Sequence, residues 1–253
     1  QGVSSAASDV YKRQMLTNPG PVMIFNGDVM SSHSLEEQIE FHEKSKADIT
    51  LYLTKVPDAR AFGSVELDAD KRILTFNEKM ENPPTNIINA GCYIFNREVI
   101  DSIPADKVVS VERETFPQVL ANGGRVFGFV DESYWLDIGT PSAFLKATRD
   151  LIEGNASSPA FARDFDQRKI FSDGEHFAHG LSVVIEEPST ITAGSYLGNE
   201  VIVGANATLR NCIIGEGAKI GEKSVLINCF VAPEFEIPPS TIAENSFFGF
   251  PHP

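Results

Sequence analysis

The sequence has few cysteines and a single tryptophan. Three cysteines and one tryptophan occur among 253 residues. Because the cysteines form no Cys-x-x-Cys motif, they do not predict a disulfide scaffold, and we expect a reduced, cytoplasmic protein. No run of about 18 apolar residues occurs, so the sequence predicts no membrane partner or spanning helix. The start also lacks the basic and then apolar pattern of a signal peptide.

Positive charge is scarce as well. The chain has 21 lysines and arginines against 35 aspartates and glutamates, which gives a formal net charge of −14. Phosphate backbones are bound by basic surfaces, so this balance excludes a nucleic-acid partner. It does not exclude a single nucleotide, which a few local groups and a cation can hold. With 42% hydrophobic residues the chain is long enough to bury a sizeable core.

Two different patterns follow each other along the chain. Residues 1–14 (QGVSSAASDVYKRQ) have no periodicity, and we expect them to be a non-native segment. Residues 15–153 form the first region, residues 154–180 read as a linker rich in serine, glycine and aspartate, and residues 181–253 form the last region.

The first region alternates between strand and helix patterns. We expect strands at 21–28, 48–54, 62–79 (two strands), 89–96 and 125–130, and helices at 34–47, 113–122 and 141–154. In the first helix, Ser34 and Glu37 predict a capping box, and Leu35, Ile39 and either Phe41 or His42 predict the buried face. Interleaved strands and helices predict an α/β domain with a mainly parallel sheet.

The last region repeats every six residues. Apolar residues recur at this spacing with two slips of one residue, at Ile185, Ile191, Leu197, Val203, Leu209, Ile214, Ile220, Leu226, Val231 and Ile237. Three such hexads make one triangular coil whose apolar positions stack inside. A period of 17 across the slips predicts that Asn211 stacks under Asn228 and Cys212 under Cys229, the latter as two thiols rather than a disulfide.

Two aspartates follow predicted strands, at Asn-Gly-Asp (26–28) and Trp-Leu-Asp (135–137). Ligands of open α/β sheets bind outside the carboxyl ends of the strands. Asp28 and Asp137 converging on one Mg²⁺ ion would leave coordination positions for phosphate oxygens. The alternative is that each aspartate only stabilises a turn.

Six motifs occur in the order found in one enzyme family. They are FNGDV, FGSVELD, FNEKM, INAGCYIF, VSVERETFP and YWLDIGTP. With the hexapeptide tail, they make the chain resemble the sugar-1-phosphate nucleotidylyltransferases, and within them the mannose-1-phosphate guanylyltransferase branch. The resemblance implies a partial Rossmann-like nucleotidyltransferase domain over 15–153, followed by a left-handed β-helix of hexapeptide repeats.

The resemblance also implies roles for residues in these motifs. Asp28 and Asp137 would be the Mg²⁺ ligands, and Lys79 would meet the sugar phosphate as a compact positive charge. The sugar hydroxyls would be bound by Glu78, Asn89, Gly91 and Glu112, with Gly63 allowing close backbone approach. The alternative is that Glu78 and Lys79 are a solvated pair and that Gly91 marks a bulge.

The sequence departs from the family pattern in two places. Met80 stands where the family usually has proline after Glu-Lys, which alters a turn. The Gly-rich loop G-G-x-G-T-R-L and the Pro-Lys that follows it do not occur. We therefore expect a catalytically incomplete fragment that lacks the first part of its nucleotide domain, including the base-binding segment, and that is itself inactive.

The implied reaction transfers a nucleotidyl group from a nucleoside triphosphate (GTP) to a sugar 1-phosphate (mannose 1-phosphate), and releases pyrophosphate. Two alternatives stay open: a glucose-1-phosphate thymidylyl- or uridylyltransferase, and a non-catalytic regulatory homologue. An acyltransferase using the coils themselves is disfavoured because residues 183–250 contain no histidine. We expect a homo-oligomer formed through the β-helix.

Overall fold

The computed structural model describes residues 16, 19–104, 109–158, 168–170, 176–192 and 194–250. The chain forms two compact units, one made of residues up to Val29 and His33–Trp135, the other of Met30–Ser32 and Leu136–Pro253. The expected non-native segment 1–14 and much of the expected linker lie outside the described residues. No helix in the described part is long and apolar enough to cross a membrane.

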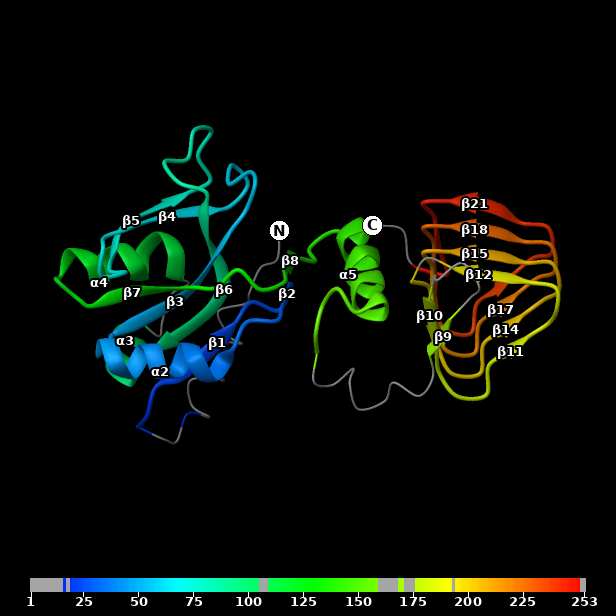
Figure 1. Ribbon diagram of the computed structural model, residues 1–253, viewed down its shortest axis with the longest axis horizontal. Helices are drawn as coiled ribbons and strands as arrows, with labels where there is room; N and C mark the ends of the chain where they lie inside the picture. Colours follow the sequence, from blue (N-terminus) through cyan, green and yellow to red (C-terminus); the bar gives the residue numbers. More distant parts are fainter. Residues whose placement is uncertain are drawn as a thin grey trace. The chain divides into compact units, whose positions relative to one another are not determined.

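The first unit is built on one mixed sheet (Figure 1). Its strand order is β5-β4-β6-β3-β7, and β1 pairs with β6. The strands are β1 (Val22–Phe25), β3 (Ile49–Lys55), β4 (Gly63–Leu67), β5 (Ile73–Glu78), β6 (Ile87–Phe95) and β7 (Val126–Val130). The α/β class predicted from the sequence is therefore confirmed.

The expectation of a mainly parallel sheet is wrong. Among the described pairings of this sheet, β3 runs parallel to β7, whereas β6 is antiparallel to β1, β3 and β4, and β4 is antiparallel to β5. The physical reason is the connectivity, because β3, β4, β5 and β6 follow one another with no helix between them. Parallel neighbours need a long crossover connection, usually a helix.

Strand β6 is irregular in its middle, at Gly91. The register with β3 shifts between Leu51 and Leu53, and Gly91 has a φ of +79°. A Cβ atom on Gly91 would lie 3.0 Å from Nδ2 of Asn26 and 3.1 Å from Cγ2 of Val29. Glycine is therefore required here for both its backbone conformation and its lack of a side chain.

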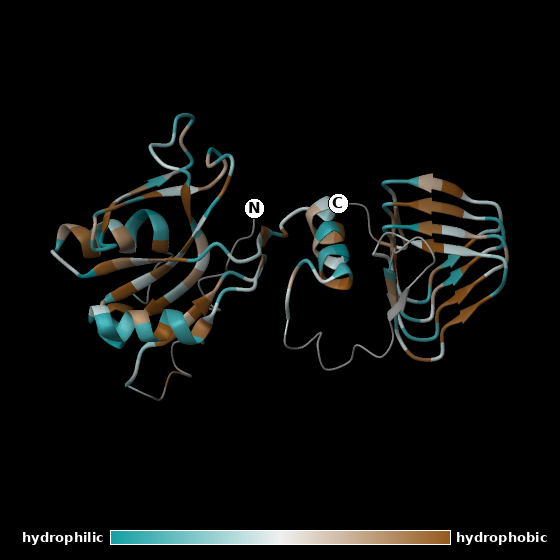
Figure 2. Cartoon of the chain, in the orientation of Figure 1, coloured by the Kyte–Doolittle hydropathy of each residue, from teal (hydrophilic) through white to brown (hydrophobic). Residues whose placement is uncertain are grey.

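Helix α2 (Leu35–Ser45) begins where the sequence predicts, because Ser34 Oγ accepts a hydrogen bond from Glu37 N at 3.2 Å. Its buried face was predicted correctly at His42, which was the alternative to Phe41, and wrongly at Leu35 and Ile39. Leu35 and Ile39 are 40% and 44% exposed, while Gln38 and His42 are 0% and 4% exposed. The two polar side chains are buried because they hydrogen-bond to groups outside the helix. Most of α2 is coloured hydrophilic in Figure 2.

The other helices in the described part of this unit are short. They are α3 (Arg97–Ser102) and α4 (Phe116–Ala121), and α4 is preceded by one π-helical turn, η1 (Val111–Thr115). Pro117 lies in the first turn of α4, where its missing N–H costs nothing. Phe116 packs on Phe95, Phe76 and Tyr93, with ring centroids 5.5–5.9 Å apart.

The second unit contains a parallel β-solenoid with three faces (Figure 1). Strand β10 (His176–His179), which also pairs with β9 (Arg168–Ile170), begins the first face, and two further faces of four strands each complete the coil. The first face continues with β13 (Tyr196–Leu197), β16 (Ile213–Ile214), β19 (Phe230–Val231) and β22 (Phe247–Phe248). The second has β11 (Val184–Ile185), β14 (Ile202–Val203), β17 (Lys219–Ile220) and β20 (Glu236–Ile237). The third has β12 (Thr190–Thr192), β15 (Thr208–Arg210), β18 (Val225–Ile227) and β21 (Ile242–Glu244).

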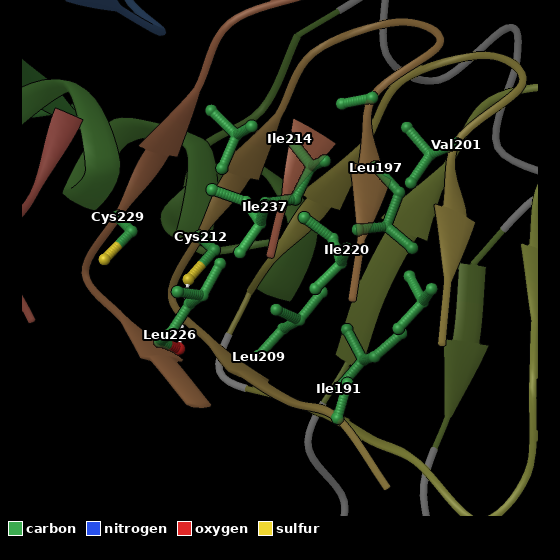
Figure 3. Close-up of a cluster of buried hydrophobic side chains, with 14 of the residues drawn as sticks. Ile191, Leu197, Val201, Leu209, Cys212, Ile214, Ile220, Leu226, Cys229 and Ile237 are labelled. Carbon is green, nitrogen blue, oxygen red and sulfur yellow. Dashed lines mark hydrogen bonds between the residues drawn. The ribbon is translucent and has the colours of Figure 1, made fainter. Parts of the chain in front are cut away.

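The apolar residues of the hexapeptide pattern fill the interior of the solenoid (Figure 3). Leu197, Val203, Leu209, Ile214 and Leu226 are all 0% exposed. In-register pairs such as Leu209 with Leu226 stack successive coils. The predicted solenoid and its inward positions are confirmed.

One corner of the solenoid carries a ladder of asparagines. Asn211, Asn228 and Asn245 have φ values of 50°, 52° and 51°, and Gly194 takes the same left-handed conformation one coil earlier. Asn211 Nδ2 donates to Asn228 Oδ1 at 2.7 Å, and Asn228 Nδ2 donates to Asn245 Oδ1 at 3.1 Å. The stacking predicted for Asn211 and Asn228 is confirmed.

Helix α5 (Pro141–Glu153) belongs to the solenoid unit. Thr140 caps it by accepting from Ala143 N at 3.2 Å, and it ends, as predicted, at Gly154, which has the left-handed conformation. Phe144 stacks on Phe230 with ring centroids 6.1 Å apart. A Cβ atom on Gly194 would lie 2.6 Å from Cα of Arg149, so the absence of a side chain there admits the helix.

Candidate functional site

Strand β6 carries polar side chains around its bend, although most of the strand is buried. Asn89 Nδ2 lies 2.8 Å from Tyr93 Oη and 2.8 Å from Glu112 Oε1. Asn89 Oδ1 accepts from the backbone N of Gly91 at 3.3 Å, and the carbonyl of Gly91 accepts from Asn26 N at 2.7 Å. The bend thus joins Asn89 to the turn that follows β1.

Glu112 reaches β6 from the π-helical turn η1. The turn is held at its start by a reciprocal cap: Ser110 Oγ accepts from Arg113 N at 3.2 Å, and Glu114 Oε1 accepts from Ser110 N at 3.1 Å. Single π-turns are frequently found at functional sites. Here the turn places the carboxylate of Glu112 against Asn89.

The amide of Asn89 is largely occupied within the protein. An asparagine amide has two N–H donors and two acceptor positions on Oδ1. The donors serve Tyr93 and Glu112, and one acceptor position serves Gly91. A ligand hydroxyl can therefore use Asn89 through its remaining acceptor position.

Tyr93 contributes a phenol to this group of side chains. Its residue is 4% exposed, and its hydroxyl lies 3.3 Å from Glu112 Oε1 as a donor. Burial raises the pKa of Tyr93, and hydrogen bonds from Asn89 and Asn26 act in the opposite direction. The phenol is therefore a neutral donor throughout the physiological pH range.

A second group of predicted residues lies on the β4–β5 hairpin. Gly63 pairs with Glu78 across the hairpin, and Lys79 follows with a φ of 44° and donates its backbone N–H to Phe62 O at 3.2 Å. The side chain of Lys79 is exposed. The side chain of Glu78 lies outside the described part of the structure.

Trp135 connects the hairpin to the bend of β6. Its indole Nε1 donates to the carbonyl of Ala90 at 3.0 Å, and its ring meets Phe62 edge to face at a centroid distance of 5.4 Å. Ala90 lies between Asn89 and Gly91. The tryptophan therefore fixes the backbone of the polar segment from one side.

The two aspartates predicted as metal ligands lie at the ends of short elements. Asp28 is exposed in the turn after β1 and directly precedes β2 (Val29–Ser31), and Asp137 is the last residue of β8 (Trp135–Asp137). Strands β2 and β8 pair with each other. Asp137 Oδ1 accepts from Gly139 N at 2.8 Å, so the turn-stabilising role considered for it is present. Asp28 belongs to the first unit and Asp137 to the second.

Among the described residues, no three histidine, cysteine, aspartate or glutamate side chains gather into a metal-binding group. Mg²⁺ is usually held by one or two carboxylates together with substrate phosphates. A pair of carboxylates would therefore suffice for this ion, and a closed cage of protein ligands is absent from the described part.

The structure brings several of the predicted residues together and adds others. Asn89, Gly91 and Glu112 are joined by hydrogen bonds, and Gly63 is joined to Glu78 by strand pairing. Sequence reasoning missed Tyr93 and Asn26. Tyr93 lies in the motif INAGCYIF together with Asn89 and Gly91, and Asn26 lies in FNGDV together with Asp28. Their places in these motifs are the signal by which the sequence indicates them.

The class of protein is given by comparison of the sequence with protein-family models. Residues 4–154 match the family model described as Nucleotidyl transferase. The match covers more than half of the chain, which therefore belongs to this family. It begins inside the segment 1–14 that the sequence pattern sets apart.

Three relatives show which enzymes of this family the chain is similar to. The chain is 43% identical over 199 residues to a mannose-1-phosphate guanylyltransferase of Mycobacterium tuberculosis, covering 78% of this chain and 53% of that protein. It is 29% identical over 231 residues to mannose-1-phosphate guanylyltransferase 1 of Arabidopsis thaliana, covering 90% and 59%. A glucose-1-phosphate adenylyltransferase of Desulfitobacterium hafniense is 26% identical, covering 87% and 55%. The chain thus spans a little over half the length of these relatives.

Proposed function

We propose that this chain is part of a sugar-1-phosphate nucleotidyltransferase that uses mannose 1-phosphate and GTP. The observation that carries the proposal is the hydrogen-bonded set of Asn89, Gly91 and Glu112 at the bend of β6. These are residues to which the family resemblance assigns the sugar hydroxyls. The 43% identity to a mannose-1-phosphate guanylyltransferase supports the choice of sugar and base.

In this proposal the sugar ring lies against the bend of β6. Glu112 accepts from one hydroxyl, and Asn89 accepts from another through its remaining acceptor position. Gly63 and Gly91 let the backbone approach the ring, and Glu78 binds a further hydroxyl. A carboxylate bound to a sugar hydroxyl is a charge-assisted hydrogen bond, which is stronger than a neutral one.

The phosphates are held by positive charge. The exposed ammonium group of Lys79 meets the phosphate of the sugar, and Asp28 and Asp137 hold a Mg²⁺ ion. When bound, the ion neutralises phosphate charge that two carboxylates alone would repel. Asp137 can accept the backbone N–H of Gly139 with one oxygen and retain the other for the ion.

The reaction is a direct substitution at phosphorus. A phosphate oxygen of mannose 1-phosphate forms a bond to the α-phosphorus of GTP, and the bond from that phosphorus to the bridging oxygen of pyrophosphate breaks. GDP-mannose and pyrophosphate result. No protein nucleophile takes part, so the residues contribute by positioning the reactants and by compensating their charge.

Two related functions compete with this one. A glucose-1-phosphate nucleotidyltransferase is favoured by the 26% identity to the adenylyltransferase of Desulfitobacterium hafniense. A regulatory homologue would bind the sugar phosphate without turning it over. The metal aspartates argue against the second, because a sensor of the sugar has no need of them.

We further propose that the solenoid mediates homo-oligomer formation. Several large apolar side chains of the solenoid are exposed, among them Leu181 (65%), Ile242 (81%) and Phe247 (52%). Pairing such surfaces between copies would remove apolar area from water. The sedimentation coefficient of the chain at several concentrations tests this expectation.

The proposed function is tested by binding and by turnover. The chain is titrated calorimetrically with mannose 1-phosphate and with glucose 1-phosphate, both in the presence of Mg²⁺, and formation of GDP-mannose from GTP is measured with the full-length enzyme of which we propose this chain is a part. We expect mannose 1-phosphate to bind more tightly than glucose 1-phosphate. Binding of neither sugar phosphate would refute the proposal, and tighter binding of glucose 1-phosphate would move it to the first alternative.

A further inference from the structure

We propose that Tyr93 is a positioning residue, which holds Glu112 and Asn89 in the geometry needed to bind the sugar hydroxyls. The inference rests on the proposed function and adds a residue to it. Tyr93 acts through these two neighbours and does not itself have to touch the substrate.

The ring of Tyr93 is anchored by other aromatic rings. Phe116 lies 5.5 Å and Phe95 lies 6.1 Å from it, measured between ring centroids, and both pack with tilted or edge-to-face geometry. Phe95 and Phe116 are each 1% exposed. A side chain packed in this way has one rotamer, because close-packed interiors leave no room for another. The position of the hydroxyl is therefore fixed by the core of the first unit.

The hydroxyl connects the two polar neighbours. It accepts from Asn89 Nδ2 at 2.8 Å and donates to Glu112 Oε1 at 3.3 Å. Asn89 Nδ2 donates to the same carboxylate oxygen at 2.8 Å. These three contacts form a closed triangle, in which moving any one side chain breaks two hydrogen bonds.

These hydrogen bonds hold Glu112 in place, because Glu112 lies on η1 whereas Asn89 and Tyr93 lie on β6. Glu112 stands on the π-turn η1, 19 residues beyond Tyr93 in sequence, and no strand pairing ties that turn to β6. A carboxylate on a turn would otherwise sample several rotamers and lose entropy on binding a ligand. The phenol and the amide remove that freedom beforehand, which is preorganisation of a binding group.

The chain contains a matched control for removal of the phenolic oxygen. Tyr52 lies in the same sheet and is 0% exposed, whereas the hydrogen bonds described above for Glu112 and Asn89 are with Tyr93, with Gly91 and with each other. Tyr93→Phe and Tyr52→Phe therefore each delete one buried oxygen, but Tyr93→Phe alone removes a hydrogen-bond partner from Glu112 and from Asn89.

The test compares the two variants in calorimetric titrations with mannose 1-phosphate and with inorganic phosphate, both in the presence of Mg²⁺. For Tyr93→Phe we expect the dissociation constant of mannose 1-phosphate to rise about tenfold, since a hydrogen bond to a charged group is lost. That of inorganic phosphate, which has no sugar ring, should not change. Tyr52→Phe should bind both ligands like the unaltered chain.

A second measurement guards against a folding defect. In the absence of ligand, the side-chain amide resonances of Asn89 should shift in Tyr93→Phe and stay in place in Tyr52→Phe, while the backbone spectra of both remain dispersed. Equal affinity of Tyr93→Phe and the unaltered chain for mannose 1-phosphate would overturn the inference. So would an equal loss of affinity for both ligands, since that indicates general damage.

The variant Glu112→Gln separates the two proposals. If Glu112→Gln weakens the binding of mannose 1-phosphate and Tyr93→Phe does not, the role of Tyr93 fails and the proposed function stands. If the unaltered chain binds no sugar phosphate, both proposals fail together.

Discussion

Nδ2 of Asn211 lies 2.7 Å from Oδ1 of Asn228, which follows it by 17 residues. Both residues adopt the left-handed backbone conformation. Asparagine suits this corner because it tolerates that backbone conformation and because its side-chain amide carries both a hydrogen-bond donor and an acceptor. The ladder therefore adds side-chain hydrogen bonds at one corner to the parallel strand pairing that links successive coils.

The ladder makes two substitutions at one residue informative. Asn228→Gly keeps the backbone conformation and removes the hydrogen bonds, so it should lower the free energy of unfolding by ~1 kcal/mol. Asn228→Ala adds the steric cost of the left-handed conformation and should lower it by ~2–3 kcal/mol. Urea unfolding followed by circular dichroism measures both. Equal losses would mean that the backbone conformation contributes nothing.

The two roles of Asp137, its negative charge and its hydrogen bond in the turn, can be tested separately. Asp137→Asn retains an oxygen that can accept from Gly139, but it loses the negative charge proposed to hold Mg²⁺. In the full-length enzyme of which we propose this chain is a part, we expect the Mg²⁺-dependent release of pyrophosphate to fall on the order of 10²-fold, as for other electrostatic groups. Asp131→Asn is the control, because Asp131 makes the same kind of turn by accepting from Ser133 N at 2.7 Å. Normal turnover by Asp137→Asn would refute the metal assignment.

Glu112 can be tested against its neighbour on the same π-turn. Glu112→Gln keeps the shape of the side chain and removes its charge, so the affinity for mannose 1-phosphate should fall roughly tenfold. Glu114→Gln should leave that affinity unchanged, because Glu114 caps Ser110. Isothermal titration calorimetry measures both. A larger effect of Glu114→Gln would indicate that the fold of η1, and not the carboxylate of Glu112, determines binding.

His42 predicts a dependence of stability on pH. Burial lowers its pKa below the usual value of 6.5, against smaller opposing effects of Asn96, Glu43 and Asp48. Its ring nitrogens meet Thr50 Oγ1 at 2.8 Å and Asn96 Oδ1 at 3.1 Å.

The folded chain therefore binds a proton at His42 less readily than the unfolded chain. The resulting stability is complete above pH 6.5 and is lost as the pH falls from there through the lowered pKa. We expect the melting temperature to fall between pH 7.5 and 5.5, and to fall less in His42→Gln. An identical slope for the variant would show that other groups account for the effect.

The cysteines should be unreactive in the folded chain. Cys92, Cys212 and Cys229 are all free and buried. Burial raises the pKa of Cys92 to about 12, whereas the hydrogen bond with Cys212 lowers the pKa of Cys229 to about 7. Cys229 should nevertheless react slowly with Ellman's reagent, because it is 0% exposed. We expect slow reaction under native conditions and three thiols per chain in denaturant. One thiol per chain in denaturant would reveal a disulfide between Cys212 and Cys229.

The solenoid could be predicted almost to the residue because its inward positions are set by local periodicity. Leu209 and Leu226 occupy equivalent places in consecutive coils, and the slips in the repeat mark the turns where a coil shortens. Strand alternation in the first unit gave the strands but not their directions, since parallel and antiparallel strands share one period.

Other features depend on partners far apart in sequence. Gln38 is buried where its side chain meets the thiol of Cys92, and no helical pattern contains that information. Tyr93 has its role only because a π-turn brings Glu112 to it, and π-turns have no simple periodicity. The metal assignment of Asp28 and Asp137 stays a prediction.

The packing of α5 decides where this protein can be divided. Phe144 stacks on Phe230, and Arg149 lies against Gly194, so the helix that starts after Asp137 shares its apolar surface with the coils. Truncating the gene between this helix and the repeats would expose the apolar side chains that pack between them, such as Phe144 and Phe230, and favour aggregation into inclusion bodies. An expression boundary ahead of Leu136 would leave the helix and the coils as one body.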